Sequence, residues 1–253
     1  MDNKYILRKE TLERADKSTY TVNIVRSGCC EVSLISAMTD PEQMIAKVSQ
    51  TYTGTLEDVD LPKEKVDVFF ADQMRTKLTT PLEMLYMVFL VKNVSRALTH
   101  QFVRTRIASY AQESMRFLGS KAEYNVLASS RMPSNSLNLY SYAINYSIKT
   151  YEDLLSVGIS SEDARGVLPT NILTGLFVGI SMKTLQHVYE QRMCCQAQPG
   201  EWQPILTKMK EAINWTLGEK IASLLSAPYE RGEPCGYRAS YDRPCVWSNK
   251  DAK

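Results

Sequence analysis

The chain has 253 residues, of which 44% are hydrophobic and 23% are charged, a composition typical of a folded globular protein. Its 30 basic and 28 acidic side chains leave a net charge of +2, which argues against a strongly basic nucleic-acid-binding protein or a polybasic membrane protein. No apolar run approaches the roughly 20 residues that cross a bilayer, and the N-terminal sequence lacks the apolar segment of a signal peptide. We therefore expect a cytoplasmic protein with no membrane partner.

The cysteines and histidines favour neither a metal site nor a disulfide framework. Cys29-Cys30 and Cys194-Cys195 are adjacent in sequence, unlike the CxxC pairs of zinc sites. We expect reduced thiols and no bound metal, while the pairing state of Cys235 and Cys245 is left open. The chain has only two histidines, which argues against a hydrolase with a Ser-His-Asp triad.

In chain order, the first clear pattern is "TYTVNIV", whose alternating apolar residues predict a half-buried strand. A helix should follow, with Asp40 as its cap, Pro41 in its first turn and Gly54 after its end. A second helix is predicted over "PKEKVDVFFADQMRTK".

The middle of the chain mixes helix and strand signals. Residues 80–83 form the capping-box pattern Thr-Pro-Leu-Glu, which predicts a helix start. The continuation over 86–91 is aromatic and β-branched and predicts a strand. Helical spacing returns in "NVSRALTHQFVRTR", which places Gln101 and Arg104 on adjoining turns at a helix C-terminus, where the helix dipole favours arginine.

The second half is predicted to be largely helical. A long amphipathic helix should end at Gly158, and a short one should be capped by Ser160. "SMKTLQHVYEQRM" and "QPILTKMKEAINWTLGEKIASLLSAP" predict two further helices. Helices outnumber strands, so the expected class is α+β.

No internal repeat or long linker divides the chain. We therefore expect a single catalytic domain over residues 1–228, with residues 229–253 as a C-terminal tail on its surface. The sequence contains no GxxxxGK[ST], GxGxxG, HExxH or GxSxG pattern, so the common nucleotide-loop, zinc-protease and hydrolase chemistries are not indicated.

The positive signal is a set of arginines in and after "QFVRTRIASYAQESMRF". One interpretation is structural, with ion pairs to Glu113, Glu162 or Glu190. A second is an anion site, because guanidinium groups bind phosphate with two parallel hydrogen bonds. A third, an RNA-binding surface, lacks an extended aromatic and basic face, so nucleic acid is not an expected partner.

The same segment resembles the signature of the flavin-dependent thymidylate synthase family, an Arg-His-Arg followed by a spaced Ser and Arg. Here the residues are Arg104-Thr105-Arg106, Ser114 and Arg116. "IAKVSQTY", "TTPLEM", "SSEDARGVLPTN" and "SMKTLQHVYEQRM" resemble other family segments in the same order. The resemblance runs from about residue 40 to about residue 221 and marks a divergent member of the family.

The resemblance implies a thymidylate synthase-like fold, with helices around a central, mainly antiparallel sheet, and a homotetramer with active sites at subunit interfaces. The implied reaction converts dUMP to dTMP. FAD is the bound cofactor, methylenetetrahydrofolate supplies the carbon, and NADPH regenerates the flavin.

The resemblance also assigns residues to roles. Arg192 would be catalytic, through its charge at the uracil ring. The residues expected to line the dUMP site are Gln101, Arg104, Gln112, Glu113, Ser114, Met115, Arg116, Arg165 and Arg192. The residues expected to contact FAD are Ser49, Thr80, Arg104, Thr105, Arg106, Gln112, Ser181, Lys183 and His187.

Departures from the family pattern concentrate on the expected flavin and folate side. They are Thr105 for the central His, Ala111-Gln112 for Asn-Glu, Leu78 for a His, Ser181-x-Lys183 for Asn-x-Arg, and His187 for Asn. They keep two alternatives open: a related C5-methylase or hydroxymethylase acting on UMP or a modified pyrimidine nucleotide, and a nucleotide-binding homologue without flavin catalysis. A structural or RNA-binding helical protein is a third alternative.

Overall fold

The computed structural model describes residues 2–76, 78–194, 197 and 200–233. Cys195, Cys235, Cys245 and most of the expected tail lie outside the described residues. The strands are β1 (Ile6–Glu13), β2 (Thr19–Val25), β3 (Glu31–Ser36), β4 (Tyr86–Ser95), β5 (Ala108–Gln112), β6 (Glu123–Leu127) and β7 (Leu173–Ser181). The helices are α1 (Pro41–Ser49), α2 (Lys63–Arg75), α3 (Thr80–Met84), α4 (Arg96–Phe102), α5 (Leu137–Ser156), α6 (Ser161–Ala164), α7 (Met182–Arg192), α8 (Trp202–Leu217) and α9 (Glu219–Ala222). Short 3-10 turns are η1 (Asn3–Tyr5), η2 (Gln50–Thr53), η3 (Met115–Phe117), η4 (Ser134–Ser136) and η5 (Arg165–Val167).

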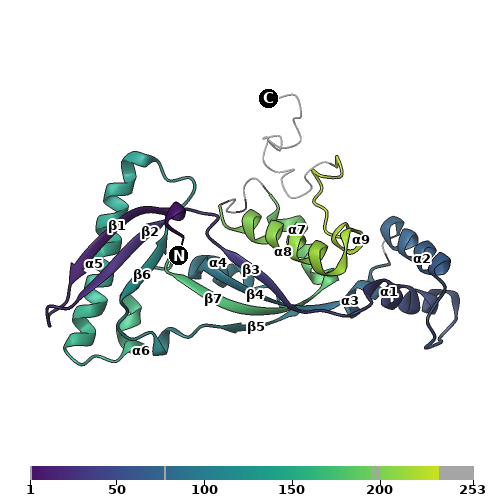
Figure 1. Cartoon of the computed structure of the whole chain (residues 1–253), viewed down its shortest axis with the longest axis horizontal. Helices are drawn as coiled ribbons and strands as arrows, with labels where there is room; N and C mark the ends of the chain where they lie inside the picture. Colours follow the sequence, from purple (N-terminus) through teal and green to yellow (C-terminus); the bar gives the residue numbers. More distant parts are fainter. Residues whose placement is uncertain (1, 77, 195–196, 198–199, 234–253) are drawn as a thin grey trace. The chain divides into compact units, whose positions relative to one another are not determined.

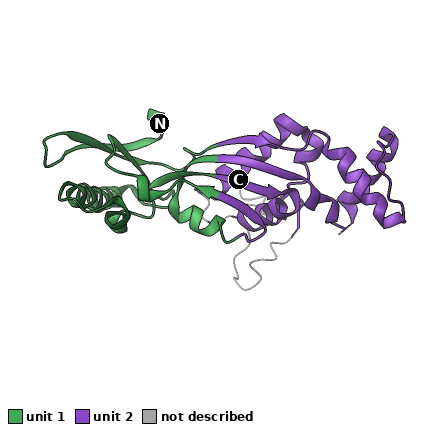
Figure 2. Ribbon diagram, turned by 90° about the horizontal axis from the view of Figure 1, so that it is seen from below, with its two compact units in different colours: residues 1–31, 91–104, 111–176 green, residues 32–90, 105–110, 177–253 purple. Residues whose placement is uncertain are grey.

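The chain divides into two compact units, each assembled from separate stretches of sequence (Figure 2). The first unit contains residues 1–31, 91–104 and 111–176, and the second contains residues 32–90, 105–110 and 177 onwards. The mixture of helices and sheets confirms the α+β class, and the labels of Figure 1 show the element order.

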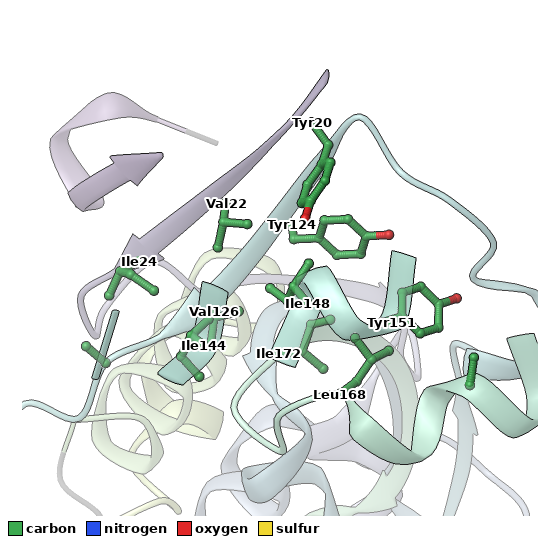
Figure 3. Packing of buried hydrophobic residues seen from close by; sticks show 12 residues of the cluster. Tyr20, Val22, Ile24, Tyr124, Val126, Ile144, Ile148, Tyr151, Leu168 and Ile172 are labelled. Atoms are coloured by element: carbon green, nitrogen blue, oxygen red, sulfur yellow. The ribbon is translucent and has the colours of Figure 1, made fainter. Parts of the chain in front are cut away.

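The core of the first unit lies between a three-stranded sheet, in the order β1-β2-β6, and helix α5. β1 pairs with β2 antiparallel, and β2 pairs with β6 parallel. Strand alternation directs Tyr20 and Tyr124 toward α5, where Tyr151 completes a row of edge-to-face rings with centroids 5.9 Å and 6.3 Å apart (Figure 3). Aromatic rings prefer this arrangement, so the row fixes the sheet against the helix.

A second sheet has the strand order β3-β4-β7-β5. Its two central strands each end in a buried serine that caps the following helix. Ser95 ends β4 and accepts a hydrogen bond from the Leu98 N–H at 3.0 Å at the start of α4, and Ser181 ends β7 and accepts one from the Thr184 N–H at 3.3 Å at the start of α7. Because a side-chain oxygen satisfies an otherwise unpaired helix N–H, each serine both ends a strand and begins a helix.

In the second unit, a lysine ties three helices together. Lys220 of α9 binds Glu42 of α1 at 2.5 Å and Asp67 of α2 at 2.6 Å, and its ammonium group lies 4.7 Å from the ring centroid of Phe70. These contacts fix α1 and α2 beside the C-terminal helices of the same unit.

Several predicted elements are confirmed. β2 forms over Thr19–Val25, and α1 begins after Asp40, which accepts a hydrogen bond from the Gln43 N–H at 3.1 Å. Gly158 has a φ of +88°, as expected for the residue that ends α5, and Ser160 caps α6.

Three predicted boundaries are wrong. Thr79, not Thr80, precedes α3 and makes no side-chain cap, and Glu83 of the predicted capping box binds Lys183. The helical spacing predicted from residue 93 begins only at Arg96, since β4 continues to Ser95. The last long helix is broken at Gly218, whose φ of +89° is incompatible with helix, into α8 and α9.

Within the part of the chain that the structure describes, no helix is long and apolar enough to span a bilayer.

Candidate functional site

The residues that we expect to bind the nucleotide are divided between the two units. The first unit holds Gln101, Arg104, Gln112, Glu113, Ser114, Met115, Arg116 and Arg165, and the second holds Arg192. Most of the flavin candidates lie in the second unit: Ser49, Thr80, Thr105, Arg106, Ser181, Lys183 and His187.

The first turn of α4 fixes the segment that carries the signature serine. Arg96 Nη2 donates a hydrogen bond to the Glu113 carbonyl at 2.6 Å, and Gln112 Nε2 donates one to Thr99 Oγ1 at 2.8 Å. The Glu113 N–H in turn donates to the Gly175 carbonyl at 3.0 Å. The backbone is therefore held on both sides of Glu113, immediately before Ser114.

Arg96 was not among the residues predicted from the sequence. No local sequence signal marks it, because the predicted helix begins at residue 93 and Arg96 becomes the first helical residue only in the structure.

The Glu113 side chain makes two long contacts. Thr174 Oγ1 donates to Glu113 Oε2 at 3.4 Å, and Lys121 Nζ lies 3.9 Å from Oε1. Its carboxylate is therefore held only loosely within the first unit.

Arg116 and Ser114 are exposed, and each makes a contact with a nearby residue. Arg116 forms an ion pair with Glu162 at 2.7 Å, with both side chains about half exposed, so the structural interpretation is confirmed for this arginine. Ser114 Oγ accepts a hydrogen bond from the Arg116 N–H at 3.2 Å. Exposed ion pairs contribute only about 0–1 kcal/mol, so an incoming phosphate can replace Glu162 at little cost.

Other signature arginines are not neutralised in this way. Among residues 2–76, 78–194, 197 and 200–233, no carboxylate forms an ion pair with Arg104, Arg106 or Arg165. Arg104 and Arg106 are exposed, and Arg165 is half-buried at the start of η5. These guanidinium groups fit anionic ligands, which is the second interpretation of the sequence.

Burial and a second cation act on Arg96. Burial lowers the pKa of Arg96, the Glu113 carboxylate opposes that shift, and the Arg165 guanidinium lowers the pKa further. The two guanidinium groups therefore repel each other, and a shared anion would relieve the repulsion.

The flavin candidates already have local partners in the second unit. Ser181 caps α7, Lys183 binds Glu83, and the His187 Nε2 lies 2.6 Å from Gln191 Nε2. Ser49 is buried, whereas Thr80 and Arg106 are exposed. Arg106 and the half-exposed Lys183 are suited to a pyrophosphate, because both can give their cationic groups to a ligand at the surface.

Arg192 is the last residue of α7, and its guanidinium lies 5.0 Å from the ring centroid of the fully buried Trp202. A helix C-terminus favours a cation, and the indole face adds a cation–π attraction. The position of the charge is therefore favoured by two independent effects.

The α+β fold places the guanidinium groups of Arg96 and Arg116 next to the Ser114 turn, and guanidinium groups are suited to anionic ligands. Residues 33–215 match the family described as "Thymidylate synthase complementing protein". The chain belongs to this family, which confirms the expectation from the sequence.

Relatives in the family carry the name flavin-dependent thymidylate synthase. The protein from Saccharolobus solfataricus is 31% identical over 187 residues, which cover 72% of each chain. The protein from Clostridium tetani is 30% identical over 189 residues, covering 66% of this chain and 76% of the relative.

Solved structures share the fold. The UMP/dUMP methylase PolB from Streptomyces cacaoi, bound with 5-Br dUMP, has a TM-score of 0.62 at 19% identity, covering 78% of this chain and 95% of that one. The same methylase bound with 5-Br UMP has a TM-score of 0.59 at 17% identity, covering 80% and 97%.

Proposed function

We propose that this chain methylates C5 of a uracil nucleotide, converting dUMP to dTMP with FAD as cofactor, methylenetetrahydrofolate as carbon donor and NADPH as reductant. The proposal includes a cytoplasmic homotetramer and a single catalytic domain over residues 1–228. The observation that carries it is the set of guanidinium groups around the Ser114 turn, within a chain of the thymidylate synthase complementing protein family.

The first unit would bind the nucleotide. Ser114 and Arg116 offer a hydroxyl and a guanidinium to the phosphate, and Arg165 adds a second cation. Gln101 and Gln112 supply amide groups that can match the uracil edge. Glu113, Met115 and Arg104 complete the proposed lining.

Ser114 is a binding residue rather than a nucleophile in this proposal. Its hydroxyl oxygen accepts the Arg116 N–H at 3.2 Å. A serine nucleophile needs an adjacent general base, and the described residues place no histidine or carboxylate in hydrogen-bonding contact with Ser114.

Arg192 would act on the uracil ring. A fixed cation stabilises negative charge on the pyrimidine as N3 loses its proton or the ring accepts an electron pair. Trp202 and the helix end hold this guanidinium in place before the substrate binds, so little reorganisation is needed during the reaction.

The residues of the second unit fit a flavin dinucleotide. Arg106 and Lys183 suit its pyrophosphate, and Ser49, Thr80, Thr105, Ser181 and His187 offer polar groups. Arg104 and Gln112 are further proposed flavin contacts. The bound flavin would supply the hydride chemistry of the reaction.

The test is purification followed by single-turnover methylation. We expect a yellow protein that converts dUMP to dTMP, and an Arg192→Ala variant with turnover reduced on the order of 10²- to 10³-fold. FAD content should be unchanged in the variant, because the arginine acts on the uracil. Equal loss of FAD and turnover would contradict the role of Arg192.

Substrate choice is measured in the same assay. Thr105 and Gln112 motivate a second candidate, methylation of UMP or a modified pyrimidine nucleotide, and faster turnover of UMP than dUMP would select it. A colourless protein that binds dUMP but takes up no FAD would instead identify a nucleotide-binding homologue without flavin catalysis. Sedimentation velocity tests the proposed tetramer.

A further inference from the structure

Arg96 and Arg14, two arginines of the first unit, differ in the partners of their guanidinium groups. Arg14, also in the first unit, binds the buried carboxylate of Glu152 through Nε at 2.8 Å and Nη2 at 3.2 Å. Arg96 Nε, by contrast, is buried and has no hydrogen-bond partner among the described residues. A buried donor without an acceptor destabilises the fold, so Arg96 is poorly explained as a stabilising residue.

The contact that Arg96 does make leads to the proposed phosphate site. Its Nη2 holds the Glu113 carbonyl at 2.6 Å, one residue before Ser114. Arg96 therefore helps to hold the backbone that leads into Ser114.

The charge of Arg96 is equally unusual in its surroundings. It lies within electrostatic range of the Arg165 guanidinium. Two cations that repel each other are unfavourable in the free protein, and a phosphate dianion would attract both of them.

We propose that Arg96 is a positioning residue of the nucleotide site: it fixes the Glu113 carbonyl ahead of Ser114 and, with Arg165, creates the positive potential that selects a phosphate dianion. This inference rests on the proposed function. It predicts that Arg96 discriminates nucleotides from nucleosides, although it need not touch the ligand.

The experiment compares the affinities of the full-length protein for dUMP, deoxyuridine and inorganic phosphate. Arg96→Met should weaken dUMP and phosphate binding roughly 10- to 100-fold, the range expected for a lost charge-assisted interaction. Deoxyuridine affinity should change less than about threefold, because a nucleoside carries no phosphate. Arg96→Lys should recover a large part of the loss, since it restores the charge.

Arg26→Met is the matched control. Arg26 is also in the first unit and also donates its Nη2 to a backbone carbonyl, that of Lys4 at 2.7 Å, but it is exposed. We expect dUMP and phosphate affinities like those of the unmodified protein. Thermal unfolding of all variants provides a readout of stability, and Arg96→Met should unfold at the same or a higher temperature.

The outcomes are distinct. Equal dUMP affinity in Arg96→Met and Arg26→Met, or equal weakening of dUMP and deoxyuridine, would overturn the inference while leaving the proposed function intact. Phosphate binding that depends on Arg96, in a protein that does not bind dUMP, would overturn the proposed substrate and support the inference. If the unmodified protein binds neither ligand, both are wrong.

Discussion

Glu152 is the residue on which the polar contacts inside the first unit converge. Its side chain is 3% exposed and accepts hydrogen bonds from Arg14 Nε at 2.8 Å and from Ser120 Oγ at 2.6 Å. The Tyr124 hydroxyl donates to its other oxygen. Arg14 also donates to the carbonyl of Lys121. This network holds the chain shortly after the Ser114 turn, as Arg96 holds it shortly before.

Loss of the Glu152 carboxylate should therefore be costly. Glu152→Ala leaves the Arg14 guanidinium and the Tyr124 hydroxyl without their main acceptor in the core, and we expect a loss of roughly 3–5 kcal/mol in the free energy of unfolding, the range for a broken buried pair. Urea denaturation measures it. The only ion pair that the neighbouring Asp153 makes within the described part of the chain is an exposed one with Lys149 at 3.0 Å, so Asp153→Ala should cost about 0.5 kcal/mol or less. Similar losses for the two variants would contradict the network.

The same carboxylate should make the protein sensitive to acid. Burial raises the pKa of Glu152, but the hydrogen bonds from Arg14, Ser120 and Tyr124 outweigh burial, and the net pKa lies below its ordinary value of 4.5. A carboxyl whose pKa is lowered by folding stabilises the protein above its ordinary pKa and loses that contribution as the pH falls through the folded value. Melting temperatures measured from pH 7 to pH 3 should fall less steeply below pH 4.5 in Glu152→Gln than in the unmodified protein.

At the scale of elements, two strand–serine–helix segments organise the second sheet. Met182 follows Ser181, and its N–H donates at 2.8 Å to the carbonyl of Leu85, the residue before β4. Arg96 follows Ser95, and its N–H donates at 3.2 Å to the carbonyl of Ile172, the residue before β7. Each capping serine thus lies beside the start of the other strand. The sites carried by α4 and α7 depend on where these two helices begin.

Ser181 is also a flavin candidate, and the two roles can be separated. If Ser181 acts only as a helix cap, Ser181→Ala should lower the free energy of unfolding by about 1 kcal/mol, measured by urea denaturation. The FAD content of the folded protein should then be unchanged. Ser95→Ala is the matched control, because Ser95 caps α4 in the same way and is not a flavin candidate. A fall in FAD affinity for Ser181→Ala alone would support direct contact with the cofactor.

The helices were predictable because their ends carry local signals. Asp40, Gly158 and Ser160 act through neighbouring backbone groups, which a sequence reveals directly. β5 and β6 are each five residues long, too short for an alternation to be distinctive. β7, "LTGLFVGIS", is a nearly continuous apolar run, which periodicity does not distinguish from a buried helix.

Only part of the candidate site was predicted from the sequence. The signature residues lie within one short segment, and their resemblance to a family pointed to them. Arg96 acquires its significance from the Glu113 carbonyl, 17 residues later, and from Arg165. Contacts between distant segments have no local pattern, so the structure was needed to find it.

At the scale of the whole molecule, the region matched to the family is smaller than the folded body. The match begins at residue 33, yet β1 and β2 precede it and supply Tyr20, Val22 and Ile24 to the core of the first unit. The N-terminal hairpin is therefore an integral part of that unit.

Deletion of residues 1–31 should unfold the first unit selectively. It removes one face of the core around Ile148 of α5, a side chain that is fully buried. We expect amide hydrogen exchange in α5 to become fast, while α8 in the second unit keeps its protection. Leu7→Ala is the control, because Leu7 lies on β1 but is 46% exposed, and it should leave both helices protected. Unchanged exchange in α5 after the deletion would show that the hairpin is dispensable.

The interleaving of the two units has a consequence for biosynthesis. Neither unit is a continuous stretch of sequence, since the first is complete only at residue 176. Ribosomes add roughly 5–20 residues per second, so β2 leaves the exit tunnel on the order of ten seconds before α5 can cover it. During that interval the apolar face of the hairpin is open to chaperones and to neighbouring nascent chains, and substitutions there would lower the yield of protein before they change its catalysis.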